Sequence, residues 1–201
     1  MLRVGLTGGL ASGKSLVGHS LVDLGCHLIE ADALGHEVLL PDGEAYAPVV
    51  NEFGREILDA DGAIDRRRLA GLVFGYPERL AKLSSFVHPA VVRREEQILA
   101  GIQSSDPDGI VVVEAAILVE TGSYRRFARL IVAMCGRELQ IQRAMKRDGL
   151  TRDEVLARLD RQLPLEEKVK LADYVIDTSG AKEHALEQTR EVYRSLRSLQ
   201  P

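Results

Sequence analysis

Cysteine, tryptophan and long apolar runs are scarce or absent in this sequence. Its 201 residues include two cysteines, five histidines and no tryptophan. Two cysteines in a chain of this size do not build a disulfide framework, so we expect buried, reduced thiols at Cys26 and Cys135 and a cytoplasmic location. The histidines are scattered without zinc-ligand spacing, which argues against a transition-metal site. No apolar run approaches membrane-spanning length, and a predicted strand begins too early to leave room for a signal peptide.

An excess of positive charge is also absent. The 26 Lys and Arg residues are outnumbered by 30 Asp and Glu residues, which gives a formal net charge of -4. Such a chain has no basic field to attract nucleic acid, and we expect neither a nucleic-acid nor a membrane partner. A polyanionic ligand would instead have to be bound by a local group of cations and backbone N–H groups.

Short β-branched segments alternate with longer segments of helical period. The third and fourth candidate strands are nearly continuous apolar runs, which is typical of strands buried on both faces. The alternation predicts an α/β fold in one domain, with a parallel sheet covered by helices on both faces. The five predicted strands are Leu2–Leu6, His27–Glu30, Ile110–Glu114, Arg129–Cys135 and Tyr174–Asp177.

A helical insert is predicted between the second and third strands. About eighty residues separate these strands, far more than a crossover helix needs. Apolar residues recur at helical spacing over residues 46–53, 69–73 and 80–87. Pro89 is expected at the first position of a further helix. We therefore assign residues 33–107 to a helical insert that ends in a turn-rich loop.

The N-terminal region carries one strong motif. Residues Gly8–Ser15 have the spacing Gly-x-x-x-x-Gly-Lys-Ser, between an apolar strand and a helix. This pattern is typical of a phosphate-binding loop, in which backbone N–H groups and a helix N-terminus surround a phosphate. Lys14 would reach the β- and γ-phosphate oxygens, and the Ser15 hydroxyl would bind Mg²⁺. An ordinary glycine-rich turn is the alternative.

Acidic residues follow the carboxyl ends of two other predicted strands, where open α/β sheets bind their ligands. Asp32 would orient an acceptor hydroxyl or remove its proton as a general base. Alternatively, Asp32 is the N-cap of a helix over residues 33–39. Glu114 would support Mg²⁺ through water, or serve only as a structural acid. We expect Glu120, further along the chain, to be structural.

A cation-rich helical hairpin is predicted after the fourth strand. Residues 137–147 form its first helix, and Thr151–Glu154 has the capping-box pattern that begins a second helix. Because arginine suits phosphate contact, we expect residues 137–170 to form a lid over the nucleotide. A solvated hairpin is the alternative. The cations are Arg137, Arg143, Lys146, Arg147, Arg152, Arg158, Arg161 and Lys168. An amphipathic helix over residues 182–199 follows.

Together these residues resemble the dephospho-coenzyme A kinase family over nearly the whole chain. The similarity covers the segments Val4–Ser15, Ile29–Asp32, Phe53–Phe74, His88-Pro89 and Arg143–Ile176. Six positions depart from the family pattern. They are Ala11 for a common glycine, Glu30 and Glu114 for aspartates, Ala116 for proline, Val119 for phenylalanine and Thr178 for asparagine.

The resemblance implies a P-loop kinase with a five-stranded parallel core, an acceptor-binding helical insert and a helical lid. It implies transfer of the γ-phosphoryl of ATP, with Mg²⁺, to the ribose 3′-hydroxyl of dephospho-coenzyme A. This is the last step of coenzyme A biosynthesis. The implied catalytic residues are Asp32, Lys14 and Arg143; the acceptor-binding residues are Asp32, Arg66 and His88; the Mg²⁺ ligands are Ser15 and, through water, Glu114. The implied nucleotide-binding residues are Gly9, Leu10, Ala11, Ser12, Gly13, Lys14, Ser15, Leu16 and Arg143.

The residues alone leave other functions open. A kinase of another small acceptor, such as a nucleoside monophosphate, has the same loop and the same strand-end acids. A nucleotide-switch GTPase would read guanine with an Asn-Lys-x-Asp segment, which this sequence lacks. An ATP-binding regulatory protein without catalysis is a third alternative.

Overall fold

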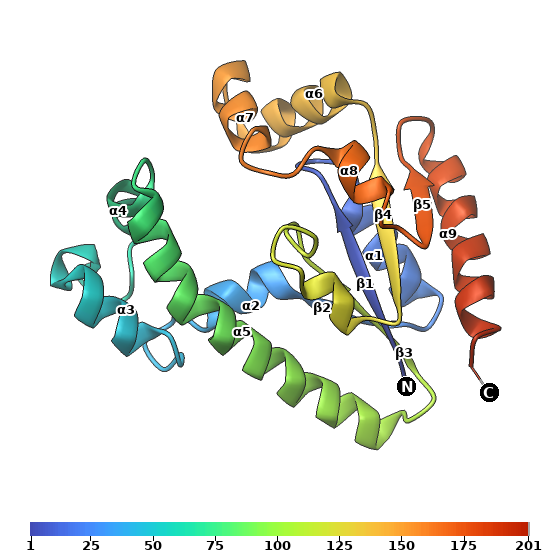
Figure 1. Ribbon diagram of the computed structural model, residues 1–201, viewed down its shortest axis with the longest axis horizontal. Helices are drawn as coiled ribbons and strands as arrows, with labels where there is room; N and C mark the ends of the chain where they lie inside the picture. Colours follow the sequence, from blue (N-terminus) through green and yellow to red (C-terminus); the bar gives the residue numbers. More distant parts are fainter. Residues whose placement is uncertain (201) are drawn as a thin grey trace. The chain divides into compact units, whose positions relative to one another are not determined.

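A computed structural model describes residues 1–200 of the chain (Figure 1). The chain divides into two compact units. The first, which we call the core unit, comprises Met1–Glu30 and the chain from Ile102 onward; the second, the helical unit, is Ala31–Gly101. Over the described residues, no helix has both the length and the apolar character that crossing a bilayer requires.

A five-stranded, all-parallel sheet forms the centre of the core unit. Its strands are β1 (Leu2–Gly8), β2 (His27–Glu30), β3 (Ile110–Glu114), β4 (Arg129–Met134) and β5 (Tyr174–Asp177), in the order β2-β3-β1-β4-β5. The five predicted strands are confirmed, although β1 runs on to Gly8 and β4 ends at Met134. Leu6 is in register with Glu114 on one side and Ile131 on the other. The loop after β1 therefore leaves the middle of the sheet at its carboxyl edge.

Helices α1 (Lys14–Asp23) and α9 (Lys182–Arg197) pack on one face of this sheet (Figure 1). Apolar residues that alternate along the strands meet α1 through Val17 and Leu21, and α9 through Val192 and Leu196. The amphipathic C-terminal helix is thus confirmed, with its end at Arg197. Both cysteines are buried and free, as the sequence predicts.

The helical unit has its own apolar core. It contains α2 (Ala31–Glu37), α3 (Tyr46–Phe53), the short 3₁₀ helix η1 (Arg55–Ile57), α4 (Arg66–Val73) and most of α5 (Pro77–Ser105). Val49, Ile57 and Leu69 are among the side chains buried at its centre. Asp65 caps α4 by accepting from the backbone N–H groups of Arg67 and Arg68. The helical spacing that the sequence shows in this region is confirmed.

The prediction that Pro89 begins a helix is wrong. Pro89 lies inside α5, a single helix of 29 residues. A proline inside a helix costs about 3 kcal/mol, because it removes the N–H bond to the carbonyl four residues earlier. However, Phe86, Val87 and Ala90 lie around the proline and pack in the same core. Ala90 is buried and the other two side chains are half-buried, so the apolar face continues past the proline, which favours one continuous helix over a break at residue 89.

The remaining helices of the core unit follow β3 and β4. They are the 3₁₀ helix η2 (Ser123–Arg126), α6 (Arg137–Asp148), α7 (Arg152–Leu159) and α8 (Leu165–Val169). The capping box is confirmed, because Thr151 and Glu154 each accept from the other's backbone N–H. Ile141, Ala144 and Val155 form a small core between α6 and α7, with Leu10 and Ala11 packed against it. The hairpin is therefore joined to the loop that follows β1.

Candidate active site

The segment Gly8–Ser15 turns sharply from β1 into α1. Gly13 is the residue before the helix and has a φ of 86°, in the left-handed region that favours glycine. A Cβ at Gly13 would also lie 3.0 Å from the side chain of Thr178. Ala11 has a φ of 53°, although it has a Cβ. This conformation suits glycine, which is common at this position in the family that the sequence resembles. Alanine in this left-handed conformation costs roughly 1–2 kcal/mol of backbone strain.

The loop has the features of an anion-binding site. Among the described residues, no side-chain hydrogen bond caps the N-terminus of α1, and such a helix N-terminus attracts a phosphate. The hydroxyl of Ser12 is buried and, among the described residues, has no hydrogen-bond partner. The Lys14 ammonium bends back and donates to the carbonyl of Gly9 over 3.1 Å. A phosphate oxygen is a charged acceptor and would replace this neutral carbonyl with a stronger bond.

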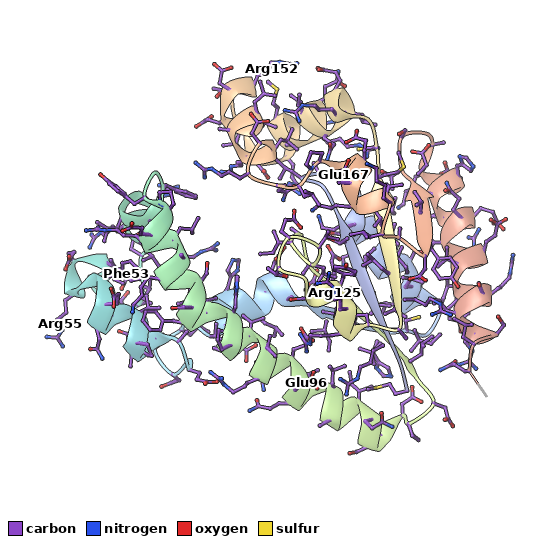
Figure 2. The ribbon with its side chains drawn as sticks, viewed as in Figure 1. Phe53, Arg55, Glu96, Arg125, Arg152 and Glu167 are labelled. Atoms are coloured by element: carbon purple, nitrogen blue, oxygen red, sulfur yellow. The ribbon has the colours of Figure 1, made fainter. Side chains whose placement is uncertain are left out.

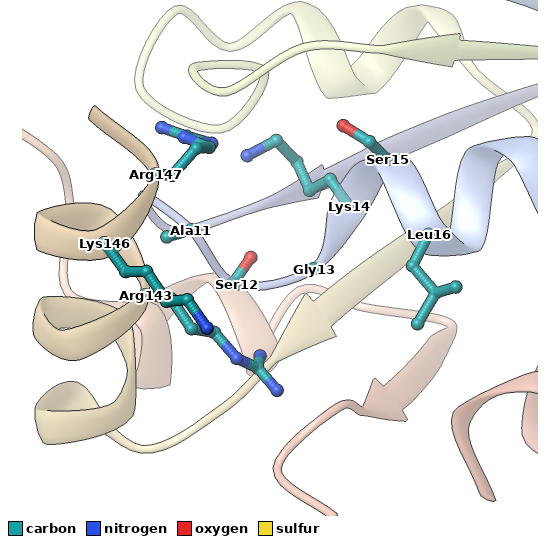
Figure 3. Close-up of a pocket in the computed structure, with 9 residues that line it drawn as sticks. All are labelled: Ala11, Ser12, Gly13, Lys14, Ser15, Leu16, Arg143, Lys146 and Arg147. Atoms are coloured by element: carbon teal, nitrogen blue, oxygen red, sulfur yellow. The ribbon is translucent and has the colours of Figure 1, made fainter. Parts of the chain in front are cut away.

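A cavity of about 520 Å³ lies between the loop and α6 (Figure 3). It is lined by Ala11, Ser12, Gly13, Lys14, Ser15, Leu16, Arg143, Lys146 and Arg147. Four of these described residues are cations and none is acidic. In a chain whose net charge is -4, this is the local concentration of positive charge that a polyanionic ligand requires.

The cations of the cavity differ in how firmly they are held. Arg143 donates to the hydroxyl of Thr178 over 3.1 Å and to its backbone carbonyl over 2.6 Å. Figure 3 shows its guanidinium pointing away from the Lys14 ammonium. Arg147 binds the two oxygens of Asp148 at 2.7 and 3.0 Å, which lowers the pKa of the Asp148 carboxyl. Thr178 is therefore a site residue in its own right, because it fixes Arg143.

Three other hairpin cations bind acids of the hairpin itself. Arg137 pairs with Asp160 at 2.7 Å, and Arg152 pairs with Glu138 at 2.8 Å on the outer side of the hairpin (Figure 2). Arg158 lies 3.8 Å from Asp148. The solvated-hairpin interpretation is correct for these three residues, whereas Arg143, Lys146 and Arg147 line the cavity.

Lys168 is not a cation of the hairpin surface, contrary to the prediction. It lies in α8, and its side chain is 0% exposed. Its ammonium is 2.7 Å from a carboxylate oxygen of Glu120, which confirms Glu120 as a structural acid. The periodicity of a charged helix does not distinguish a buried lysine from a solvated one, so the sequence contained no signal for this burial.

The phosphate loop is fastened to the hairpin at Leu10. The backbone N–H of Leu10 donates to Oε1 of Gln162 over 2.9 Å, and its carbonyl accepts from Nε2 of Gln140 over 2.9 Å. Gln140 lies near the beginning of α6, and Gln162 follows α7. Sequence reasoning missed both glutamines, because nothing in their spacing connects them with a loop more than a hundred residues earlier.

A hydroxyl group and a carboxylate group lie close together beside the loop, at the carboxyl edge of the sheet. The Ser15 hydroxyl lies 3.3 Å from Oε1 of Glu114, which is buried at the end of β3. A Cβ at Gly18 of α1 would lie 2.9 Å from Oε2 of Glu114, so glycine is needed for this close approach. A hydroxyl and a carboxylate are oxygen ligands of the type that Mg²⁺ prefers. The structure therefore brings together Ser15 and Glu114, the two residues that the sequence predicts to bind the metal.

Asp32, Arg66 and His88 belong to the helical unit. Asp32 lies in the first turn of α2, which begins at Ala31, so the N-cap interpretation of Asp32 is wrong. His36, one helical turn further, was not singled out from the sequence, although its spacing from Asp32 is a usable signal. Burial and the charge of Arg66 lower the pKa of His36, and the charge of Asp32 raises it. Asp32 and Arg66 therefore share one electrostatic environment, whereas His88 is exposed on α5.

The fold and the loop define the class of protein. A parallel sheet of order β2-β3-β1-β4-β5, a phosphate-binding loop after its central strand and a cation-bearing helical hairpin beside that loop together describe a P-loop kinase.

Comparison with known proteins places the chain within this class. The model of the dephospho-CoA kinase family matches residues 2–183. Dephospho-CoA kinase of Aquifex aeolicus is 40% identical over 196 residues, which cover 98% of each chain. That of Carboxydothermus hydrogenoformans is 44% identical over 185 residues, or 92% of this chain and 89% of the relative. A crystal structure of the Thermus thermophilus protein TT1252 is similar with a TM-score of 0.83, at 33% identity over 96% of both chains. The chain belongs to the dephospho-CoA kinase family, and its activity is that of an ATP-using kinase.

Proposed function

We propose that this enzyme transfers the γ-phosphoryl group of ATP to the ribose 3′-hydroxyl of dephospho-coenzyme A and releases coenzyme A and ADP. The observation that carries the proposal is the cavity between the phosphate loop and α6, in a chain that matches the family over residues 2–183. The two buried, reduced cysteines are consistent with a cytoplasmic enzyme.

The phosphates of ATP would occupy the cavity of the core unit. The N–H groups of the loop and the α1 N-terminus would bind the β-phosphate, and the Ser12 hydroxyl is a further donor. Lys14 would bind the transferred group, and Arg143 would bind the nucleotide from the hairpin. Because Arg143 is held by Thr178, its guanidinium needs little rearrangement when the nucleotide binds. The α6–α7 hairpin would act as the lid that excludes water.

Ser15 and Glu114 are the residues that would hold Mg²⁺. When bound, the metal would neutralise charge that develops on the phosphate oxygens. Glu114 fits this task because its buried carboxylate lies 3.3 Å from the Ser15 hydroxyl. The departure from aspartate to glutamate at position 114 thus leaves a carboxylate beside the loop serine.

The acceptor would be bound by the helical unit. Asp32 follows the carboxyl end of β2, and open α/β sheets bind ligands outside those ends. Asp32 would accept the hydrogen bond of the 3′-hydroxyl and orient it, since proton removal contributes little in a loose phosphoryl-transfer transition state. Arg66 and His88 would bind the acceptor beside Asp32. The pantetheine arm provides binding energy remote from the reacting atoms, which can be used for positioning.

A panel of acceptors tests this proposal. ATP and Mg²⁺ are supplied with dephospho-coenzyme A, adenosine, AMP or UMP in parallel, ADP release is followed continuously, and the product is analysed for a 3′-phosphate. We expect efficient turnover with dephospho-coenzyme A alone, and a marked loss of kcat/KM when its pantetheine arm is removed. If the enzyme phosphorylates AMP or UMP efficiently but does not phosphorylate dephospho-coenzyme A, the proposed acceptor is refuted. Nucleotide binding without transfer to any acceptor would support a regulatory protein instead.

A further inference from the structure

A buried lysine lies next to the phosphate loop but outside the cavity. The side chain of Lys168 is 0% exposed, and its ammonium has three oxygen acceptors. It donates to the carbonyl of Gly8 over 3.3 Å, to the carbonyl of Ala116 over 2.8 Å and to Oε1 of Glu120 over 2.7 Å. An ammonium has three N–H donors, so the three acceptors match them in number.

These acceptors connect parts of the chain that are distant in sequence. Gly8 is the last residue of β1 and the first of the phosphate loop, and Ala116 follows Glu114 by two residues. The Ala116 carbonyl also accepts from the hydroxyl of Thr7 over 3.3 Å. Glu120 accepts in addition from the backbone N–H of Leu163. One ammonium therefore joins the start of the loop to the segment that follows β3.

Stability alone is a poor explanation for this arrangement. Removing an ammonium and a carboxylate from water is costly, and well-packed apolar residues of similar volume often stabilise a fold as well or better. Two of the three bonds are made to backbone carbonyls, that of Gly8 at the end of β1 and that of Ala116 after β3.

We propose that Lys168 is a positioning residue for nucleotide binding and phosphoryl transfer. It holds Gly8 at a fixed separation from Ala116, so that the loop bearing Lys14 and Ser15 is preorganised relative to Glu114. This inference rests on the proposed function, because the loop must bind a nucleotide for its position to matter. Misplacement of reacting groups by about 1 Å costs on the order of 10²-fold in rate, so a small displacement of Gly8 is enough for a measurable effect.

Three variants separate positioning from simple stabilisation. Lys168→Met/Glu120→Gln removes both charges and all three ammonium bonds while nearly preserving side-chain volume. Glu120→Gln alone keeps the ammonium bonds to Gly8 and Ala116. Lys170→Met is the matched control, because Lys170 lies two residues further on, is exposed, and forms an ion pair with the exposed Glu167.

Each protein is measured in three ways: binding of a fluorescent ADP analogue in EDTA, thermal unfolding, and kcat and KM with ATP and dephospho-coenzyme A. For the double variant we expect about tenfold weaker nucleotide binding and a kcat lowered by roughly 10- to 100-fold. For Glu120→Gln we expect a lower unfolding temperature but nucleotide affinity within about twofold of the wild type, because the carbonyl bonds remain. Lys170→Met should behave as the wild type.

Wild-type nucleotide affinity and kcat in a folded double variant would overturn the positioning role and leave Lys168 a structural residue. Equal losses of affinity in Glu120→Gln and the double variant would also overturn it, because the ion pair and not the carbonyl bonds would then be decisive. If the double variant does not fold, Lys168→Gln/Glu120→Gln replaces it, with the same expected loss and the same contrary result. A wild-type protein that binds the ADP analogue but phosphorylates no dephospho-coenzyme A would refute the proposed function; the nucleotide affinities of the variants would then still support or overturn the role of Lys168 in nucleotide binding.

Discussion

Replacement of Lys14 by alanine is the most direct test of the phosphate loop. The Lys14 ammonium donates to the neutral carbonyl of Gly9 over 3.1 Å. Lys14 is also the first residue of α1, where alanine is an excellent helix former. We therefore expect the variant to fold with a nearly unchanged unfolding temperature.

The loss of activity should be much larger than the loss of stability. Two unit charges 4 Å apart interact by about 4 kcal/mol at an effective dielectric constant of 20. Removal of one preorganised transition-state donor costs roughly 2.7–4 kcal/mol, or about 10²–10³ in kcat. Arg143 cannot compensate, because it is bound to Thr178, and Arg147 is bound to Asp148. We expect kcat to fall by at least about 10².

Steady-state kinetics with ATP and dephospho-coenzyme A measure this effect, together with thermal unfolding of the same preparations. Lys182→Ala is a matched control, because Lys182 is likewise the first residue of a helix, α9, and is exposed. Near-normal turnover of a folded Lys14→Ala enzyme would refute the role of Lys14. A parallel loss in Lys182→Ala would show that the measurement reports helix stability instead.

Three further predictions concern the acceptor side, the hairpin and the thiols. Asp32→Asn should lower kcat by roughly 10²–10⁴, with little change in ATP affinity or unfolding temperature. The control Asp153→Asn, in the first turn of α7, should change none of these quantities. A destabilised Asp32→Asn enzyme with normal kcat would contradict the assignment of Asp32. Arg143→Ala should raise the KM for ATP and slow transfer. Arg143→Lys should not restore either, since the compact ammonium of lysine does not reproduce the planar guanidinium fork, whose two nitrogens bind the two oxygens of Thr178; unchanged ATP kinetics would refute this. Burial raises the pKa of the Cys26 thiol to about 11 and also raises that of Cys135, so neither thiol should react with a disulfide reagent at pH 8 until the protein is unfolded. Rapid labelling of the native enzyme would disprove this burial argument. The raised pKa of the Cys26 thiol also contributes stability that is present below its unfolded pKa of 9.0 and is lost as the pH rises toward 11; comparison of alkaline unfolding between the wild type and a Cys26→Ala variant tests this.

The sheet was predictable because short segments rich in apolar residues alternate with longer segments of helical period. Ile110–Glu114 is buried along its whole length, and a segment of that kind has few alternatives in an α/β chain. The phosphate loop was predictable for a different reason, since its spacing is itself the chemical requirement. The approach of Ser15 to Glu114 was predictable from the position of Glu114 at the end of a predicted strand, because parallel strands bring their carboxyl ends to one edge of the sheet.

Pro89 and Lys168 show where sequence reasoning fails. In both cases a local preference is outweighed by tertiary packing: the apolar face of α5 continues through the proline, and a lysine becomes buried where three oxygens surround it. The role of Ala116 was hidden because it depends on a backbone carbonyl, which every residue has. A proline at this position would present the same carbonyl, so the departure from the family pattern does not remove the contact.

The two bonds to Leu10 have a consequence for the entropy of nucleotide binding. Gln140 and Gln162 stand near the two ends of the α6–α7 hairpin and hold the N–H and the carbonyl of one residue. The hairpin cannot swing away from the loop without breaking one of these bonds. Part of the disorder that a flexible lid would lose on closing is therefore already absent before ATP arrives. A nucleotide that orders the loop orders the hairpin at little additional entropic cost.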